Sequence, residues 1–152
     1  MIKLEHANIS ATNAEAMTRF ITSAFPDFHV RGEGLDSYER PWRHVGNDEF
    51  YIAIQTVPTK LERKPYGNDT GLNHLGWEVD DVTTLEVRMR AAGYEPNLKA
   101  NEHPARKRVY FYDPDGNDWE FVEYTTSEVH ERNDYSDAHK RRLLEISSHY
   151  TS

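Results

Sequence analysis

The sequence has no cysteine among its 152 residues and no long hydrophobic run. Without thiols, the chain can form neither a disulfide framework nor a thiolate metal site or nucleophile. The lack of an apolar stretch of about 20 residues argues against a helical membrane span. The first residues, MIKLEHANIS, also lack the apolar core of a secretion signal. We therefore expect a cytoplasmic protein.

Positive charge is scarce as well: 18 lysines and arginines face 26 aspartates and glutamates, which gives a net charge of -8. A surface of this sign repels the phosphates of nucleic acids and of anionic membranes. Hydrophobic residues make up 37% of the chain, and its length fits one domain. We expect neither a nucleic acid nor a membrane as a partner.

Two segments have helical patterns, one over residues 12–25 and one over residues 80–93. In the first, Thr12 and Glu15 have the spacing of a capping box. The second begins after a pair of aspartates and ends at a glycine. One strand-like segment precedes each helix and three follow it, which predicts the order βαβββ twice.

The spacing of matching positions indicates an internal duplication. His6 and His74 lie 68 residues apart, and Gln55 and Glu120 lie 65 residues apart, so one short gap relates the two halves. We predict a single α+β domain over residues 1–125, with modules at about 1–57 and 71–125. Residues 126–152 form a polar C-terminal extension with a predicted short helix in AHKRRLLEISSHY. This extension is either a surface appendage or a lid or dimer contact.

Alternation along the strands assigns a face to each candidate side chain. If the apolar residues of each strand face the helices, four polar side chains face the other way: His6, Gln55, His74 and Glu120. A single strand histidine is more often structural than a ligand. Two histidines at duplicated positions, with a carboxylate on a duplicated strand, favour a metal site. The other histidines, including His44, are expected at the surface.

Three stretches resemble the vicinal oxygen chelate superfamily, which includes glyoxalase I. They are LEHANIS with the helix after it, LNHLGWEVDDVTTLEVRMRAAGYEP, and RVYFYDPDGNDWEFVEY. The resemblance covers about residues 2–125. It implies two βαβββ modules that form a cup-shaped, incompletely closed mixed sheet, with helices outside and a divalent metal ion inside.

The resemblance also implies the ligands, which are His6, His74 and Glu120, with Gln55 as a candidate fourth. The metal would be nickel, zinc, manganese or iron. Bacterial glyoxalase I usually has a glutamate where this chain has Gln55, and an amide is a weaker ligand and no base. The remaining two histidines and one carboxylate are the pattern of non-haem Fe(II) sites with open positions.

By this resemblance, we expect a metal-dependent enzyme with lactoylglutathione-lyase-like chemistry on a small substrate chelated through neighbouring oxygens. Glu120 would be both ligand and catalytic proton shuttle. The alternatives are an Fe(II) extradiol dioxygenase, a metal-dependent thiol transferase acting on a thiol conjugate, or a bleomycin-resistance-like binding protein without catalysis.

Further side chains on the strands are candidates for substrate binding. They are Tyr51, Arg108, Tyr110 and Tyr124, and Arg108 is the best candidate for an anionic group because its guanidinium is forked. Arg106 and Lys107 are expected in a solvated hairpin. Relatives are commonly homodimers, and the sequence leaves open whether the cup forms within one chain or across two.

Overall fold

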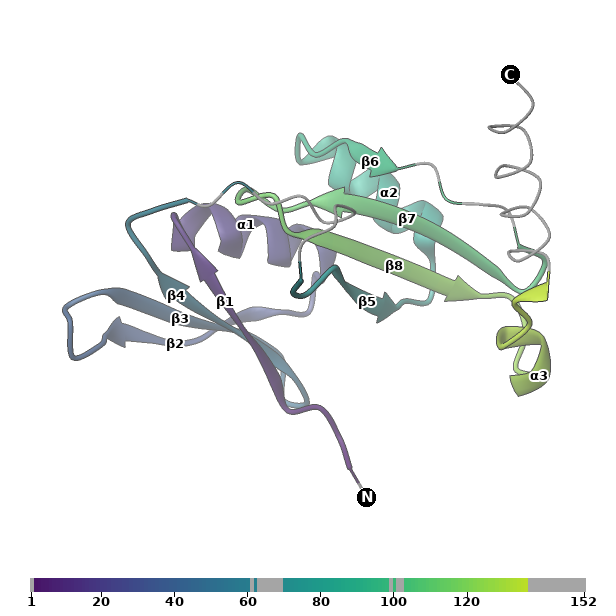
Figure 1. Cartoon of the computed structure of the whole chain (residues 1–152), viewed down its shortest axis with the longest axis horizontal. Coiled ribbons are helices and arrows are strands. Elements are labelled where there is room, and N and C mark those ends of the chain that lie inside the picture. The colour runs from purple at the N-terminus through teal and green to yellow at the C-terminus, as the bar shows by residue number, and fades with distance from the viewer. Residues whose placement is uncertain (1, 61, 63–69, 99, 101–102, 137–152) are drawn as a thin grey trace.

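The computed structural model describes residues 2–60, 62, 70–98, 100 and 103–136, and its elements follow the predicted order (Figure 1). The first module comprises β1 (His6–Ala11), α1 (Ala14–Ala24), β2 (His29–Leu35), β3 (Pro41–Gly46) and β4 (Tyr51–Thr56). The second comprises β5 (His74–Glu78), α2 (Val82–Ala91), β6 (Pro96–Leu98), β7 (Arg106–Tyr112) and β8 (Asp118–Tyr124). A short helix, α3 (Val129–Arg132), follows them.

Each module forms its own four-stranded mixed sheet, and neither sheet closes. The first sheet has the order β1-β4-β3-β2 and the second has the order β5-β8-β7-β6. In both, the first and last strands of the module pair in parallel and the remaining pairs are antiparallel. The matching topology confirms the α+β class and the duplicated βαβββ pattern.

The helices start close to the predicted positions, but one predicted cap is wrong. Asp81 caps α2 by accepting a hydrogen bond from the backbone N–H of Thr84 at 2.9 Å. Helix α1 is capped by Asn13, which accepts from the N–H of Ala16 at 3.0 Å. Thr12, the predicted cap, lies one residue earlier and binds a carboxylate of the other module instead.

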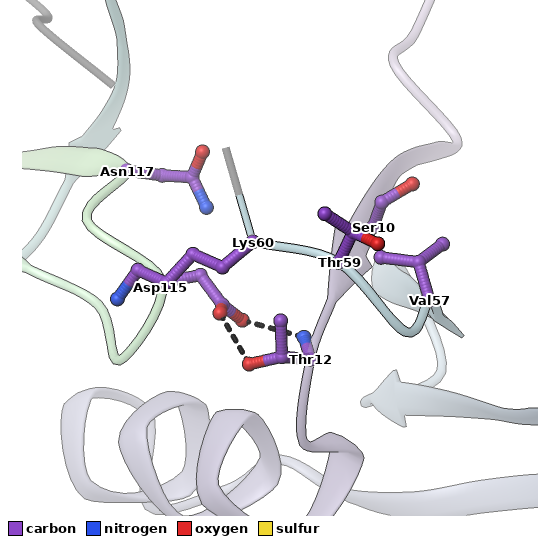
Figure 2. Close-up of a pocket in the computed structure, with 7 residues that line it drawn as sticks. All are labelled: Ser10, Thr12, Val57, Thr59, Lys60, Asp115 and Asn117. Atoms are coloured by element: carbon purple, nitrogen blue, oxygen red, sulfur yellow. Dashed lines mark hydrogen bonds between the residues drawn. The ribbon is translucent and has the colours of Figure 1, made fainter. Parts of the chain in front are cut away.

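That carboxylate belongs to Asp115 in the DPDG turn between β7 and β8. Its two oxygens accept the backbone N–H of Thr12 at 2.9 Å and the Thr12 hydroxyl at 2.6 Å (Figure 2). Gly116 in the same turn has φ +85, a left-handed conformation that glycine adopts without steric cost. The turn therefore ties the second module to the start of α1.

One hydrophobic core joins the two modules. The helix-facing residues of both sheets belong to a single buried cluster with the apolar sides of α1 and α2. Phe20 of α1 packs edge-on against Trp119 of β8 at 5.3 Å, and Phe25 lies 4.9 Å from Trp77 of β5. Because these rings face the core, the strand faces are those predicted from alternation.

The extension packs against the second sheet over its described part. Arg132 of α3 forms an ion pair with Glu78 of β5 at 2.7 Å and lies over the ring of Tyr124 at 3.8 Å. The helix predicted in AHKRRLLEISSHY lies outside the described residues. No helix among the described residues is long and apolar enough to cross a membrane.

Candidate metal centre

The predicted site residues lie on the sheet faces opposite the helices, which we call the open faces. His6, Tyr51 and Gln55 are on the open face of the first sheet. The open face of the second sheet has His74, Glu120, Tyr110, Arg108 and Tyr124. Cross-strand register supports this placement, since Glu120 is paired with Tyr110 on β7 and with Gly76 on β5. Gly76 has no side chain that would separate His74 from Glu120.

His74 and Glu120 form a close pair. Nε2 of His74 lies 3.1 Å from Oε2 of Glu120, and their side chains are 33% and 14% exposed. Two ligand atoms that each lie about 2.1 Å from a divalent ion, at a right angle, are about 3.0 Å apart. The pair therefore has the separation of two neighbouring ligands of one metal ion.

Other side chains bind the two atoms of this pair that point away from the contact, namely Nδ1 of His74 and Oε1 of Glu120. The Asn73 amide oxygen lies 2.6 Å from Nδ1 of His74, so an N–H at Nδ1 donates to it. The other ring nitrogen, Nε2, faces the Glu120 carboxylate at 3.1 Å. Such a contact needs a cation between them, either a proton or a metal ion.

Glu120 is fixed through its other oxygen. The Tyr110 hydroxyl donates to Oε1 at 2.5 Å, and the Arg108 guanidinium lies 3.6 Å from the same oxygen. Burial, followed by the hydrogen bond to Glu120, raises the pKa of Tyr110, so its hydroxyl stays protonated and remains a donor. This arrangement turns Oε2 toward His74.

The other two predicted ligands lie elsewhere. The His6 ring stacks on Tyr51 at 4.9 Å and its Nδ1 contacts Glu5. The amide of Gln55 donates to Asp36 at 3.1 Å. Within the part of the chain that the structure describes, no three His, Cys, Asp or Glu side chains lie close enough together to hold a metal ion. A single chain thus brings together two of the predicted ligands.

The predicted substrate-binding residues are divided in the same way. Arg108 and Tyr110 contact Glu120, whereas Tyr51 lies beside His6 on the first sheet. Tyr124 is at the far end of β8, under Arg132.

Some residues were misassigned or missed from the sequence. Arg106, expected in a solvated hairpin, is only 9% exposed, because Tyr135 and the backbone of Arg132 cover it. His44, expected at the surface, is a half-buried residue of β3 whose ring lies 4.7 Å from that of Tyr51. Alternation along PWRHVG could have placed His44 on the open face. Asn73 precedes its strand, and no pattern marked it.

The family model for the Glyoxalase/Bleomycin resistance protein/Dioxygenase superfamily matches residues 3–121. The chain belongs to this superfamily. The match spans both modules, including His6, His74 and Glu120. No curated protein sequence matches the chain.

Solved structures support the same fold for this superfamily member. A glyoxalase family protein from Enterococcus faecalis has a TM-score of 0.67 and 22% identity, over 80% of this chain and 97% of that chain. The fosfomycin resistance protein FosX from Listeria monocytogenes, solved with Mn(II) and sulfate, has a TM-score of 0.66 and 19% identity, over 88% and 100%. FosX from Mesorhizobium loti has a TM-score of 0.65 and 22% identity, over 87% and 98%.

Proposed function

We propose that this protein is a metal-dependent enzyme that acts on a small substrate chelated through neighbouring oxygens. The observation that carries the proposal is the 3.1 Å pair of His74 Nε2 and Glu120 Oε2, with the outer atoms of both side chains held by Asn73 and Tyr110. Ligands oriented in this way by surrounding hydrogen bonds are typical of protein metal sites. A bound divalent ion would polarise both substrate oxygens as a Lewis acid.

We further propose that the third ligand, His6, comes from a second copy of the chain. His6 lies on the open face of the first sheet and is 41% exposed at its side chain, while His74 and Glu120 lie on the open face of the second. The helix faces of both sheets are buried in one shared core, so only the open faces can meet a second copy. A homodimer that joins the first sheet of one copy to the second sheet of the other would bring three ligands together.

The contacts of Glu120 bear on the reaction. A proton shuttle of the lactoylglutathione-lyase type needs a carboxylate oxygen that is available to the substrate. Oε1 of Glu120 already accepts the Tyr110 hydroxyl and lies 3.6 Å from the Arg108 guanidinium, so protein donors occupy this oxygen. We therefore favour Glu120 as a fixed ligand and an addition reaction on an epoxide. Water or a thiol would attack a ring carbon, the bond from that carbon to the ring oxygen would break, and this oxygen would take up the proton of the nucleophile.

A relative supports this class of substrate. A mutant of Listeria monocytogenes FosX was solved with Mn(II) and 1S,2S-dihydroxypropylphosphonic acid, a compound with two neighbouring hydroxyl groups. Arg108, beside Glu120, is suited to an acidic group next to such oxygens because its guanidinium can make two parallel hydrogen bonds. Lactoylglutathione-lyase chemistry is the second candidate, because Glu120 is a carboxylate at the candidate metal centre and a carboxylate can move a proton.

Measuring the metal content of the purified protein tests the proposal of a metal-dependent enzyme. The native protein should bind stoichiometric Mn(II), Ni(II), Zn(II) or Fe(II), and His74→Ala and Glu120→Gln should lose this binding. His29→Ala, which changes an exposed strand histidine of β2, should retain it. Failure of the native protein to take up any divalent ion would refute the proposal and leave a ligand-binding protein. The loaded protein is then assayed with an epoxide plus water or a thiol, with a hemithioacetal, and with a catechol plus O2.

Mixing two variants of the subunit tests the proposal that His6 comes from a second copy of the chain. His6→Ala and His74→Ala each damage every site, but a mixed dimer would have one site built from the two intact halves. After unfolding and refolding together, about a quarter of the sites should be restored if the subunits combine at random. No recovery of metal binding, or a monomer at micromolar concentration in sedimentation, would refute the two-chain site.

A further inference from the structure

Two hollows adjoin along the seam where the modules meet. The inner one, about 290 Å³, lies between β1 and β5 and is lined by Asn8, Ser10, His74 and Asn117 among others. The outer one, about 410 Å³, lies beyond the ends of β1 and β4, beside the DPDG turn (Figure 2). Ser10 and Asn117 line both hollows, so the two share a wall of small polar side chains.

The outer hollow has the size and the lining of a small-molecule site. Its volume is within the range of about 300–1,000 Å³ that is usual for such sites. Hydroxyl groups of Ser10 and Thr59 line it, together with the apolar side chain of Val57. It therefore offers both hydrogen bonds and apolar contact.

The two charged groups of the outer hollow differ in their partners. The Asp115 carboxylate is 7% exposed, and its two oxygens each accept a hydrogen bond from Thr12. The Lys60 ammonium donates to the backbone carbonyl of Pro114 at 3.0 Å and forms no ion pair with a described residue. An ammonium has three N–H donors, so Lys60 keeps donors for a ligand.

The inner hollow lies between the outer hollow and His74 of the candidate metal centre. His74, whose Nε2 faces Glu120, lines the inner hollow. A molecule with its chelating oxygens at this histidine would reach the outer hollow past Ser10 and Asn117. Its far end would then lie near the Lys60 ammonium.

We propose that the paired hollows are one binding groove, and that the substrate carries an acidic group at the end opposite its chelating oxygens. Lys60 would bind this group, which is a carboxylate, a phosphate or a phosphonate. The inference rests on the proposed function for the chelating end of the substrate. It adds a second anchor and a substrate class, namely an elongated, oxygenated acid.

Hydroxamates provide a test because they chelate metal ions through two neighbouring oxygens. A series of linear hydroxamates of increasing length, each with either a carboxylate or its methyl ester at the far end, is titrated into the Mn(II)-loaded protein. At the length that reaches Lys60, the carboxylate should bind about fivefold more tightly than the ester, as expected for an exposed ion pair. Added salt should reduce this advantage.

Two lysine variants show whether Lys60 causes the tighter binding of the carboxylate. Lys60→Met should abolish the advantage of the carboxylate and leave the affinity of the ester unchanged. Lys3→Met is the matched control, because Lys3 is also an exposed lysine, paired with Glu49 at 3.5 Å and absent from both hollows. It should retain the full advantage.

The outcomes separate this inference from the proposed function. If neither probe binds the Mn(II)-loaded protein at any length, the chelating site is refuted and the groove with it. If both probes bind equally at every length, or if the advantage of the carboxylate survives in Lys60→Met, the groove is refuted while the metal centre stands.

Discussion

Replacing Tyr110 with phenylalanine tests how the candidate metal centre is oriented. The substitution removes one oxygen, the hydroxyl that donates to Oε1 of Glu120 at 2.5 Å. Tyr110 is 7% exposed, so water has little room to replace the lost donor. A hydrogen bond to a charged acceptor contributes about 1.5–3 kcal/mol. If that energy orients Glu120 for the metal ion, Mn(II) affinity should fall about tenfold to a hundredfold.

Isothermal titration with Mn(II) measures this change, and Tyr112→Phe is the matched control. Tyr112 follows Tyr110 by two residues on the same face of β7 but is 42% exposed. Its substitution should leave Mn(II) affinity within about twofold of native, since an exposed hydroxyl is replaced by water at little cost. Urea unfolding of both variants shows whether the fold is retained.

Two results would refute the reasoning. If Tyr110→Phe binds Mn(II) as tightly as the native protein does, Tyr110 does not orient a metal ligand. If Tyr112→Phe weakens binding to the same degree, the effect belongs to the surface of β7 and not to the hydrogen bond with Glu120.

Two further predictions concern stability. Thr12→Val removes the hydroxyl that donates to the buried Asp115 at 2.6 Å, and should lower the free energy of unfolding by about 1.5–3 kcal/mol in urea titrations, whereas Thr12→Ser should restore most of it; equal stability of the two variants would contradict this. Burial raises the pKa of Tyr110 above its ordinary 10.0, so its contribution to stability is complete below pH 10 and declines as the pH rises further, when the unfolded chain ionises first. Urea midpoints should therefore fall as the pH rises above about 10, and the fall should be smaller in Tyr110→Phe; an equal fall in both proteins would rule out this origin.

Local patterns in the sequence determined the elements and their faces. Two-residue alternation placed Glu120 opposite the helix-facing Trp119 and Phe121, and both rings are fully buried. The second helix begins at Val82, and its cap is Asp81, the second residue of the aspartate pair that predicts the start of the helix. These features depend on residues a few positions apart, so they can be recognised in a single sequence.

Tertiary structure decided which local signals prevailed. Thr12 has the residue type of a helix cap, but its hydroxyl donates to Asp115, 103 positions away. Asn13 caps the helix instead. Arg106 has the charge of a surface residue, but the C-terminal segment covers it. No periodicity describes such contacts.

The same limit applies to the candidate site. The sequence placed His6, His74 and Glu120 on the open faces, because the face of a residue depends only on its own strand. Which open faces meet depends on how the modules pack. Here His74 and Glu120 come together because β5 pairs with β8, whereas the helix faces of both sheets share one core and His6 remains on the open face of the other sheet. The sequence determined which candidate ligands each sheet presents, and only the tertiary structure decided which of them come together within one chain.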